Sequence, residues 1–128
     1  MKLIIAGSRT IGSVSTITDA LFAAGYTPES VTEVVSGGAR GVDMLGEEVA
    51  ARFSIPVKRF PANWDALGKS AGYVRNAEMA AYADALLAVW DGKSKGTNHM
   101  ITLMKKAGKP VHVYIPGTEP SLHYEAGR

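Results

Sequence analysis

Ala85-Leu86-Leu87-Ala88-Val89-Trp90 is a continuous apolar run, which is the pattern of a strand covered on both faces of a sheet. Leu3-Ile4-Ile5-Ala6 is a similar run that ends at a glycine, and residues 31–35 are rich in β-branched side chains. Residues 55–60 and 111–115 have the composition of two further strands. Strands covered on both faces belong to parallel sheets, so these five runs predict a parallel sheet with helices on both sides.

Segments with helical periodicity separate the expected strands. Apolar residues recur at helical spacing in residues 14–24, 42–53 and 97–107, and the alanine-rich residues 73–83 are the fourth expected helix. Residues 61–72 are the least regular stretch. The positions expected to face the core are Val14, Ile17, Leu21, Ala24, Val42, Leu45, Val49, Ala50, Phe53, Met100, Ile101, Met104 and Ala107.

Five strands that alternate with four helices predict an α/β fold of the Rossmann-like type, with three layers and a five-stranded parallel sheet. Right-handed crossovers leave few topologies. The strand order 3-2-1-4-5 is expected because it places the first and fourth strands side by side at a switch point. Ligands bind such sheets in the crevice outside the carboxyl ends of the strands.

The composition is that of one globular domain, with 128 residues, 46% hydrophobic and 20% charged. We expect this domain over residues 1–115, followed by a tail or oligomer arm over residues 116–128. No apolar run is long enough for a membrane helix and the first residues do not form a signal peptide, so we expect a cytoplasmic protein with no membrane partner. The absence of cysteine excludes disulfides, thiolate nucleophiles and Cys-ligated zinc. A net charge of +2 is too small to argue for nucleic acid by itself.

Three of the expected strands end in loops rich in glycine, hydroxyl groups and cations. These loops are Gly7-Ser8-Arg9, Ser36-Gly37-Gly38-Ala39-Arg40-Gly41 and Asp91-Gly92-Lys93-Ser94-Lys95-Gly96-Thr97. Parallel strands end at one edge of a sheet, so the loops and their cations meet there. Two of the loops lead into helices, whose first N–H groups attract anions. The three loops together predict a site for a phosphate or a carboxylate.

Several common classes of site are absent from the sequence. There is no G-x-x-x-x-G-K-[ST] motif, and no G-x-G-x-x-G follows the first strand, so a Walker-type ATPase and an ordinary dinucleotide dehydrogenase are not expected. His99, His112 and His123 lack the spacing of metal ligands, so no metal is expected. No cofactor is expected either. No Ser-His-Asp arrangement can be defended.

Each of three residues allows two interpretations. Asp43 either pairs with the dipole of its helix, or hydrogen-bonds to a ribose or base or holds Arg40. Arg75 is either a solvated surface cation or an arginine that reaches a phosphate or sugar from above the crevice. Trp64 either stacks on a base or anchors a core or an interface.

The loops and the segment Ala71-Gly72-Tyr73-Val74-Arg75-Asn76-Ala77-Glu78-Met79 together resemble the SLOG superfamily, and more narrowly its small stand-alone bacterial and phage members. The resemblance runs from Leu3 to about Ile115. It implies a Rossmann-like fold that binds nucleotides or nucleotide-derived ligands. The superfamily includes the Lonely Guy phosphoribohydrolases, which cut the base from a nucleoside 5′-monophosphate, and the DNA-processing protein A family, which binds single-stranded DNA.

The resemblance to the Lonely Guy enzymes is incomplete. Arg75 and Met79 match the arginine and methionine of their Arg-Lys-x-x-Met segment, with asparagine in place of the lysine. Gly96-Thr97 matches part of their Pro-Gly-Gly-x-Gly-Thr-x-x-Glu loop, but Met100 occupies the position of the glutamate implicated in hydrolysis. A thioether can neither stabilise positive charge on the ribose nor orient water. The remaining catalytic candidates are Arg75, Glu78 and Asp43.

The leading hypothesis is a domain that binds a nucleotide or nucleotide-derived ligand, with a homodimer as its expected assembly. The alternatives are a nucleoside 5′-monophosphate phosphoribohydrolase and, with less support, a single-stranded nucleic-acid binder that uses the basic rim and Trp64. The predicted ligand-binding residues are Gly7, Ser8, Arg9, Ser36, Gly37, Gly38, Arg40, Gly41, Asp43, Arg75, Asn76, Asp91, Gly92, Ser94, Lys95, Gly96 and Thr97.

Overall fold

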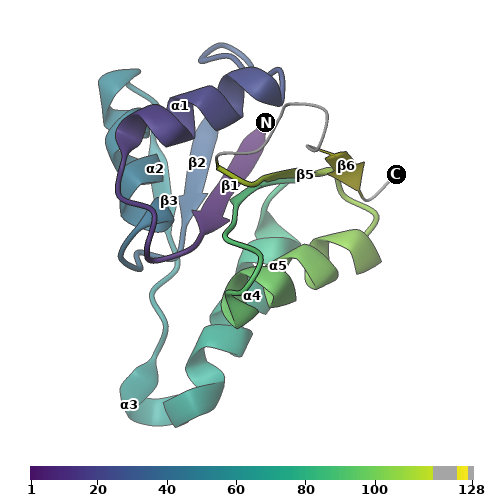
Figure 1. Cartoon of the computed structure of the whole chain (residues 1–128). Helices are drawn as coiled ribbons and strands as arrows, with labels where there is room; N and C mark the ends of the chain where they lie inside the picture. Colours follow the sequence, from purple (N-terminus) through teal and green to yellow (C-terminus); the bar gives the residue numbers. More distant parts are fainter. Residues whose placement is uncertain (117–123, 127–128) are drawn as a thin grey trace.

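A sheet with the strand order β3-β2-β1-β4-β5-β6 runs through the middle of the molecule (Figure 1). The structure is a computed structural model that describes residues 1–116 and 124–126. The strands are β1 (Lys2–Gly7), β2 (Glu33–Ser36), β3 (Val57–Arg59), β4 (Ala85–Val89), β5 (Val111–Tyr114) and β6 (Tyr124–Ala126). The helices are α1 (Val14–Ala23), α2 (Val42–Arg52), α3 (Trp64–Leu67), the 3-10 turn η1 (Gly68–Ser70), α4 (Ala71–Tyr82) and α5 (Lys95–Lys106).

The first five strands are parallel, and β1 lies between β2 and β4. Residues 3–7 of β1 pair one to one with residues 85–89 of β4, so both strands end at the same level. The expected Rossmann-like fold and the order 3-2-1-4-5 are therefore confirmed. The switch point falls between β1 and β4, where a doubly wound sheet leaves a crevice at its carboxyl edge.

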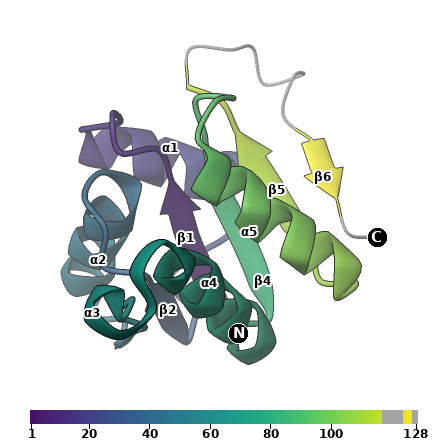
Figure 2. The ribbon, with the colours of Figure 1, turned by 90° about the horizontal axis from the view of Figure 1, so that it is seen from below.

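The side chains of each buried strand alternate between two apolar cores, one on each face of the sheet. Leu3 and Ile5 face the core under α1 and α2, whereas Ile4 and Ala6 face the core under α4 and α5. Figure 2 shows α4 and α5 lying across the same face of the sheet. All five residues of β4 are buried, as its continuous apolar run predicts.

Two helix ends differ from the expected pattern. Phe53 and Ala107 were expected to face the core, but α2 ends at Arg52 and α5 at Lys106. Each of these residues is the C-cap of its helix and is exposed. A residue beyond the last helical turn no longer follows the helical period, so both expectations were wrong. Within the irregular residues 61–72, the short helix α3 and the turn η1 form.

The chain continues past the fifth strand into β6, which pairs antiparallel with β5 and was not among the expected strands. Residues 117–123 and 127–128 lie outside the described residues, so the expected tail or oligomer arm stays a prediction. Among the helices that the structure describes, none is both long and apolar enough to cross a membrane.

Candidate functional site

The carboxyl ends of β1 and β4 open into a cleft of about 370 Å³, walled by α2, α4 and α5. Met79 of α4 and Met100 of α5 are almost fully buried and contribute its apolar part. The remaining lining residues are mostly polar or small, which suits a ligand with both charged and uncharged parts. The lining residues are Ala6, Gly7, Arg9, Thr10, Ala39, Asp43, Arg75, Asn76, Met79, Asp91, Ser94, Gly96, Thr97 and Met100.

The loop after β2 uses its first N–H groups within the protein. The N–H of Gly38 donates to Ser36 Oγ at 3.0 Å, and the N–H of Ala39 donates to Asp43 Oδ2 at 3.3 Å. Sequence reasoning expected free N–H groups here for an anion. These two donors instead hold the loop in shape. A ligand in the cleft therefore has to bind side chains and the N–H groups of other residues.

An ion pair behind this loop fixes its start. Ser36 Oγ donates to Glu47 Oε2 at 2.6 Å, and Glu47 also accepts from the guanidinium of Arg59 at the end of β3. Although partial burial opposes it, hydrogen bonding from Arg59 and Ser36 holds the pKa of Glu47 below its usual range. The side chain of Arg59 also lies against Gly38, where an added Cβ would stand 3.1 Å from Arg59 Cδ.

Gly37 is where α4 comes close to the glycine loop. A Cβ at this position would lie 2.5 Å from Arg75 Nη1 and 2.8 Å from Asp43 Oδ2. Real Cβ atoms do not approach other heavy atoms this closely, so Gly37 leaves the space in which the guanidinium lies.

Arg75 and Asn76 link the loop after β2 to the loop after β4. Arg75 Nη1 donates to the carbonyl oxygen of Gly37 at 2.8 Å, and its Nε donates to Asn76 Oδ1 at 3.0 Å. Asn76 Nδ2 in turn lies 3.2 Å from the carbonyl oxygen of Gly96 and 3.2 Å from His99 Nδ1. Two adjacent residues of one helix therefore set the spacing of two loops that are far apart in the sequence.

Asp43 is the buried carboxyl group of the cleft, with 7% of its surface exposed. Burial raises its pKa to about 6, although the N–H of Ala39 and the charge of Arg75 favour the ionised form. A carboxyl group with this pKa is mostly ionised at pH 7 and can still take up a proton in mild acid. Asp43 can therefore accept hydrogen bonds from hydroxyl groups of a ligand, or exchange a proton with one.

The loop after β4 is organised around Asp91. Its Oδ1 accepts from the N–H groups of Lys93 at 2.8 Å and Ser94 at 2.9 Å, and these bonds hold the pKa of Asp91 below its usual range. Ser8 Oγ accepts from the N–H of Asp91 at 2.9 Å, which ties the loop to the end of β1.

The loop leads directly into α5. Ser94 is the N-cap of α5 and accepts from the hydroxyl of Thr97 at 3.1 Å. The N–H groups of Lys95 and Gly96 belong to the first turn, where a helix has no carbonyl groups to offer them. Gly96 and Thr97 line the cleft, so the positive end of the α5 dipole faces it.

The two described histidines have partners of their own. The ring of His99 packs edge-on against Tyr73, with 4.6 Å between the centroids, and burial lowers its pKa. His112 Nδ1 lies 3.2 Å from the hydroxyl oxygen of Tyr26. His123 lies outside the described residues. In residues 1–116 and 124–126, no group of three His, Asp or Glu side chains is placed to hold a metal.

The predicted site residues fall into two groups. The residues that line the cleft are Gly7, Arg9, Asp43, Arg75, Asn76, Asp91, Ser94, Gly96 and Thr97. The residues that lie in the same loops without lining the cleft are Ser8, Ser36, Gly37, Gly38, Arg40, Gly41, Gly92 and Lys95. Glu78, a catalytic candidate, is exposed on α4 and is not among the lining residues.

Sequence reasoning missed the support formed by Glu47 and Arg59. Arg59 is the last residue of β3, so the rule that places strand ends at one edge of the sheet could have identified it. Glu47 lies one helical turn after Asp43 on α2, but nothing in its spacing identifies Ser36 and Arg59 as its partners.

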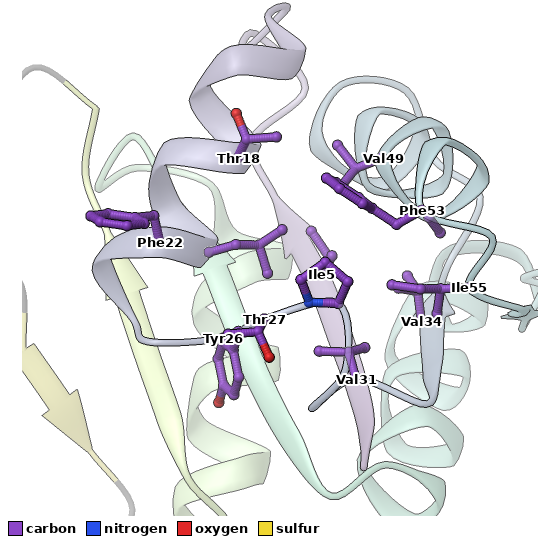
Figure 3. Close-up of a pocket in the computed structure, with 13 residues that line it drawn as sticks. Ile5, Thr18, Phe22, Tyr26, Thr27, Val31, Val34, Val49, Phe53 and Ile55 are labelled. Atoms are coloured by element: carbon purple, nitrogen blue, oxygen red, sulfur yellow. The ribbon is translucent and has the colours of Figure 1, made fainter.

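A second cavity of about 200 Å³ lies between α1 and α2, on the other face of the sheet from α4 and α5. Figure 3 shows Phe22, Phe53 and Val49 around it, with Ile5 and Val34 at its base. No charged side chain lines it. The lining is mostly apolar and its polar groups are the hydroxyls of Thr18, Tyr26 and Thr27, with no cation for a phosphate, so the polar cleft with Arg9 and Arg75 is the candidate site for an anionic ligand.

The sequence of the chain is similar to a known protein family and to a phage protein. The model of the YspA, cpYpsA-related SLOG family matches residues 1–66, a stretch that includes the loops after β1 and β2 and ends before Arg75. The chain is also similar to the Gene 61 protein of Mycobacterium phage D29, with 37% identity over 116 residues. The similar part covers 86% of this chain and 93% of that protein. No solved structure matches the chain.

Proposed function

The chain belongs to the YspA, cpYpsA-related SLOG family, and on that premise we propose that it binds a nucleotide or nucleotide-derived ligand in the polar cleft. The observation that carries the proposal is the position of Arg75. It lies in the cleft, bonded to the loop after β2 and, through Asn76, to the loop after β4.

The phosphate is assigned to the side of the cleft formed by α5. The first turn of α5 presents unpaired N–H groups and the positive end of its dipole, which favour an anion. Arg75 and the exposed Arg9 add cations to the same cleft. A guanidinium can hold a phosphate through two parallel hydrogen bonds.

The sugar is assigned to Asp43, because the amide of Asn76 is already bonded to Arg75, Gly96 and His99. An ionised Asp43 accepts hydrogen bonds, and ribose hydroxyl groups are donors that fit it. Asp43 repels a phosphate, so the carboxylate and the α5 turn favour different ends of a ligand. This arrangement supports a sugar phosphate in a defined orientation.

N-glycosidic hydrolysis is a second candidate, favoured by the position of Asp43 in the same cleft as Met100. In such a reaction, water adds to C1′ of the ribose while the bond to the base nitrogen breaks. One proton of the water goes to Asp43 as general base and then to solvent, and the departing base takes up a proton. Of the carboxylates Asp43 and Glu78, only Asp43 lines the cleft.

Calorimetric titration with ribonucleoside mono-, di- and triphosphates tests the proposed function, repeated at about 50 and 200 mM salt. We expect saturable 1:1 binding of at least one nucleotide with a modest dependence on salt. Binding of single-stranded DNA that weakens by orders of magnitude over this range, without nucleotide binding, would instead support a nucleic-acid binder.

A further inference from the structure

We propose that Trp64 is a stacking platform for the planar base of the ligand, so that the ligand runs from Arg75 out of the cleft onto α3. This inference rests on the proposed function and adds the position of the base to it. It assigns a site to a side chain that lies outside the cleft lining.

The base has no aromatic partner inside the cleft. None of the lining residues among those described carries an aromatic ring. The apolar part of the cleft is formed by Met79 and Met100, which are almost fully buried. The phosphate and sugar have polar partners in the cleft, whereas a flat apolar ring finds its most favourable partner in another ring.

Trp64 lies next to the cation of the cleft. A Cβ built at Gly72 would stand 3.5 Å from Trp64 Cη2 and 4.0 Å from Arg75 Nη2. The indole ring and the guanidinium therefore approach the same point, and no side chain at position 72 separates them. A nucleotide whose phosphate is held by Arg75 therefore has the indole within reach of its base.

Hydrogen bonds hold the short helix that carries Trp64, and the indole is accessible. Asn63 is the N-cap of α3, and its Oδ1 accepts from the N–H of Ala66 at 3.2 Å. The hydroxyl of Ser70 donates to the carbonyl oxygen of Leu67 at 2.8 Å and closes the following turn. Trp64 nevertheless has 53% of its surface exposed, which is unusual for a side chain whose role is to fill a core.

The nearby aromatic ring is less suited to this role. Tyr73 is equally exposed, but its ring packs edge-on against His99. Figure 1 shows α3 away from the sheet, at the end of the connection that follows β3. Trp64 does not line the cleft, but its ring comes near Gly72 on the same side as Arg75, so a base can stack on the indole without entering the cavity.

The test compares ligands with and without a base. The affinities of the four ribonucleoside 5′-monophosphates and of ribose 5-phosphate are measured by calorimetry for the wild type, Trp64→Ala and Trp64→Phe. We expect Trp64→Ala to weaken the tightest nucleotide by about 5- to 150-fold. Ribose 5-phosphate should bind all three proteins equally, and Trp64→Phe should keep most of the nucleotide affinity. Leu67→Ala, on the same exposed helix, is the matched control and should change neither affinity.

Each other outcome overturns a specific claim. If the wild type binds nucleotides and Trp64→Ala binds them as tightly, the stacking platform is wrong and the proposed function stands. An equal loss for ribose 5-phosphate and nucleotide, together with a changed mass by light scattering, would show that Trp64 anchors an interface instead. If neither nucleotides nor ribose 5-phosphate bind the wild type, the proposed function itself fails.

Discussion

Arg75 donates a 2.8 Å hydrogen bond to the carbonyl oxygen of Gly37, across 38 residues of sequence. The guanidinium occupies the space that a side chain at position 37 would fill. The glycine loop and the cation of the cleft are therefore one structural unit. A substitution in the glycine loop should therefore displace Arg75 and weaken ligand binding. A substitution of Arg75 should in turn disturb the loop.

Replacing Gly37 with alanine should reduce nucleotide affinity by at least tenfold. The added Cβ would stand 2.5 Å from Arg75 Nη1, so the guanidinium must move. Gly12→Ala is the matched control because nothing lies within 4 Å of its Cβ position. Calorimetry on both variants, with circular dichroism to confirm folding, measures the effect. Equal affinities in the two folded variants would separate the glycine loop from the site.

The stability of the protein should depend on pH through Asp43. Its pKa of about 6 in the folded protein exceeds the ordinary 3.8, so the folded state binds the proton more tightly than the unfolded state. Protonation therefore stabilises the fold as the pH falls from 7 to 4. Between pH 7 and pH 4, the free energy of unfolding of the wild type should rise by about 2 kcal/mol relative to that of Asp43→Asn. Urea unfolding of both proteins at several pH values measures this change. A difference in unfolding free energy that stays the same at every pH would show that the pKa of Asp43 is not raised.

The protein should bind a nucleoside monophosphate without releasing its base quickly. Met100 stands where the Lonely Guy enzymes, which the sequence resembles in part, carry a glutamate, and the loss of one preorganised charged partner lowers a reaction rate by on the order of 10²–10³. Chromatography of free base after incubation gives the rate. Any slow release should disappear in Asp43→Asn and persist in Glu78→Gln, because Asp43 lines the cleft and Glu78 does not. Rapid release that is lost in Arg75→Ala would make the hydrolase the correct function.

We expect a homodimer at micromolar concentration. Tyr73 and Val74 are large side chains exposed on neighbouring positions of α4, and exposed apolar surface of this kind can pair with a second copy of the chain. Val74→Glu should shift the mass measured by light scattering from dimer to monomer. A wild-type monomer would show that this surface has no second copy as its partner.

The fold was predictable because its signals are local. Continuous apolar runs and helical periods identify elements, and the rule for crossovers then fixes their order. The ends of the helices were less predictable, as Phe53 shows. The helical spacing of apolar residues does not identify the residue at which the helix ends. The helix α3 has four residues and no periodicity at that length, so no pattern could reveal it.

The candidate site was predictable only in part. Glycine and cations after strands identify the edge where a ligand binds, and Arg75 stood out through its resemblance to a known segment. The internal use of N–H groups by Ser36 and Asp43 could not be predicted, because it depends on atomic positions within a turn. The pair of Glu47 and Arg59 joins two elements through space, and a single sequence carries no sign of such a pairing.

The nucleotide affinity of Arg75→Ala, measured by calorimetry beside that of Arg52→Ala, tests whether the polar cleft is the ligand site. Arg52 is an exposed arginine on α2 that pairs with Glu48 at 3.5 Å and does not line the cleft. We expect the tightest-binding nucleotide to lose about 10- to 150-fold in affinity in Arg75→Ala and to bind Arg52→Ala as tightly as the wild type. Equal affinities for the wild type and Arg75→Ala would contradict the claim that this cleft holds the ligand.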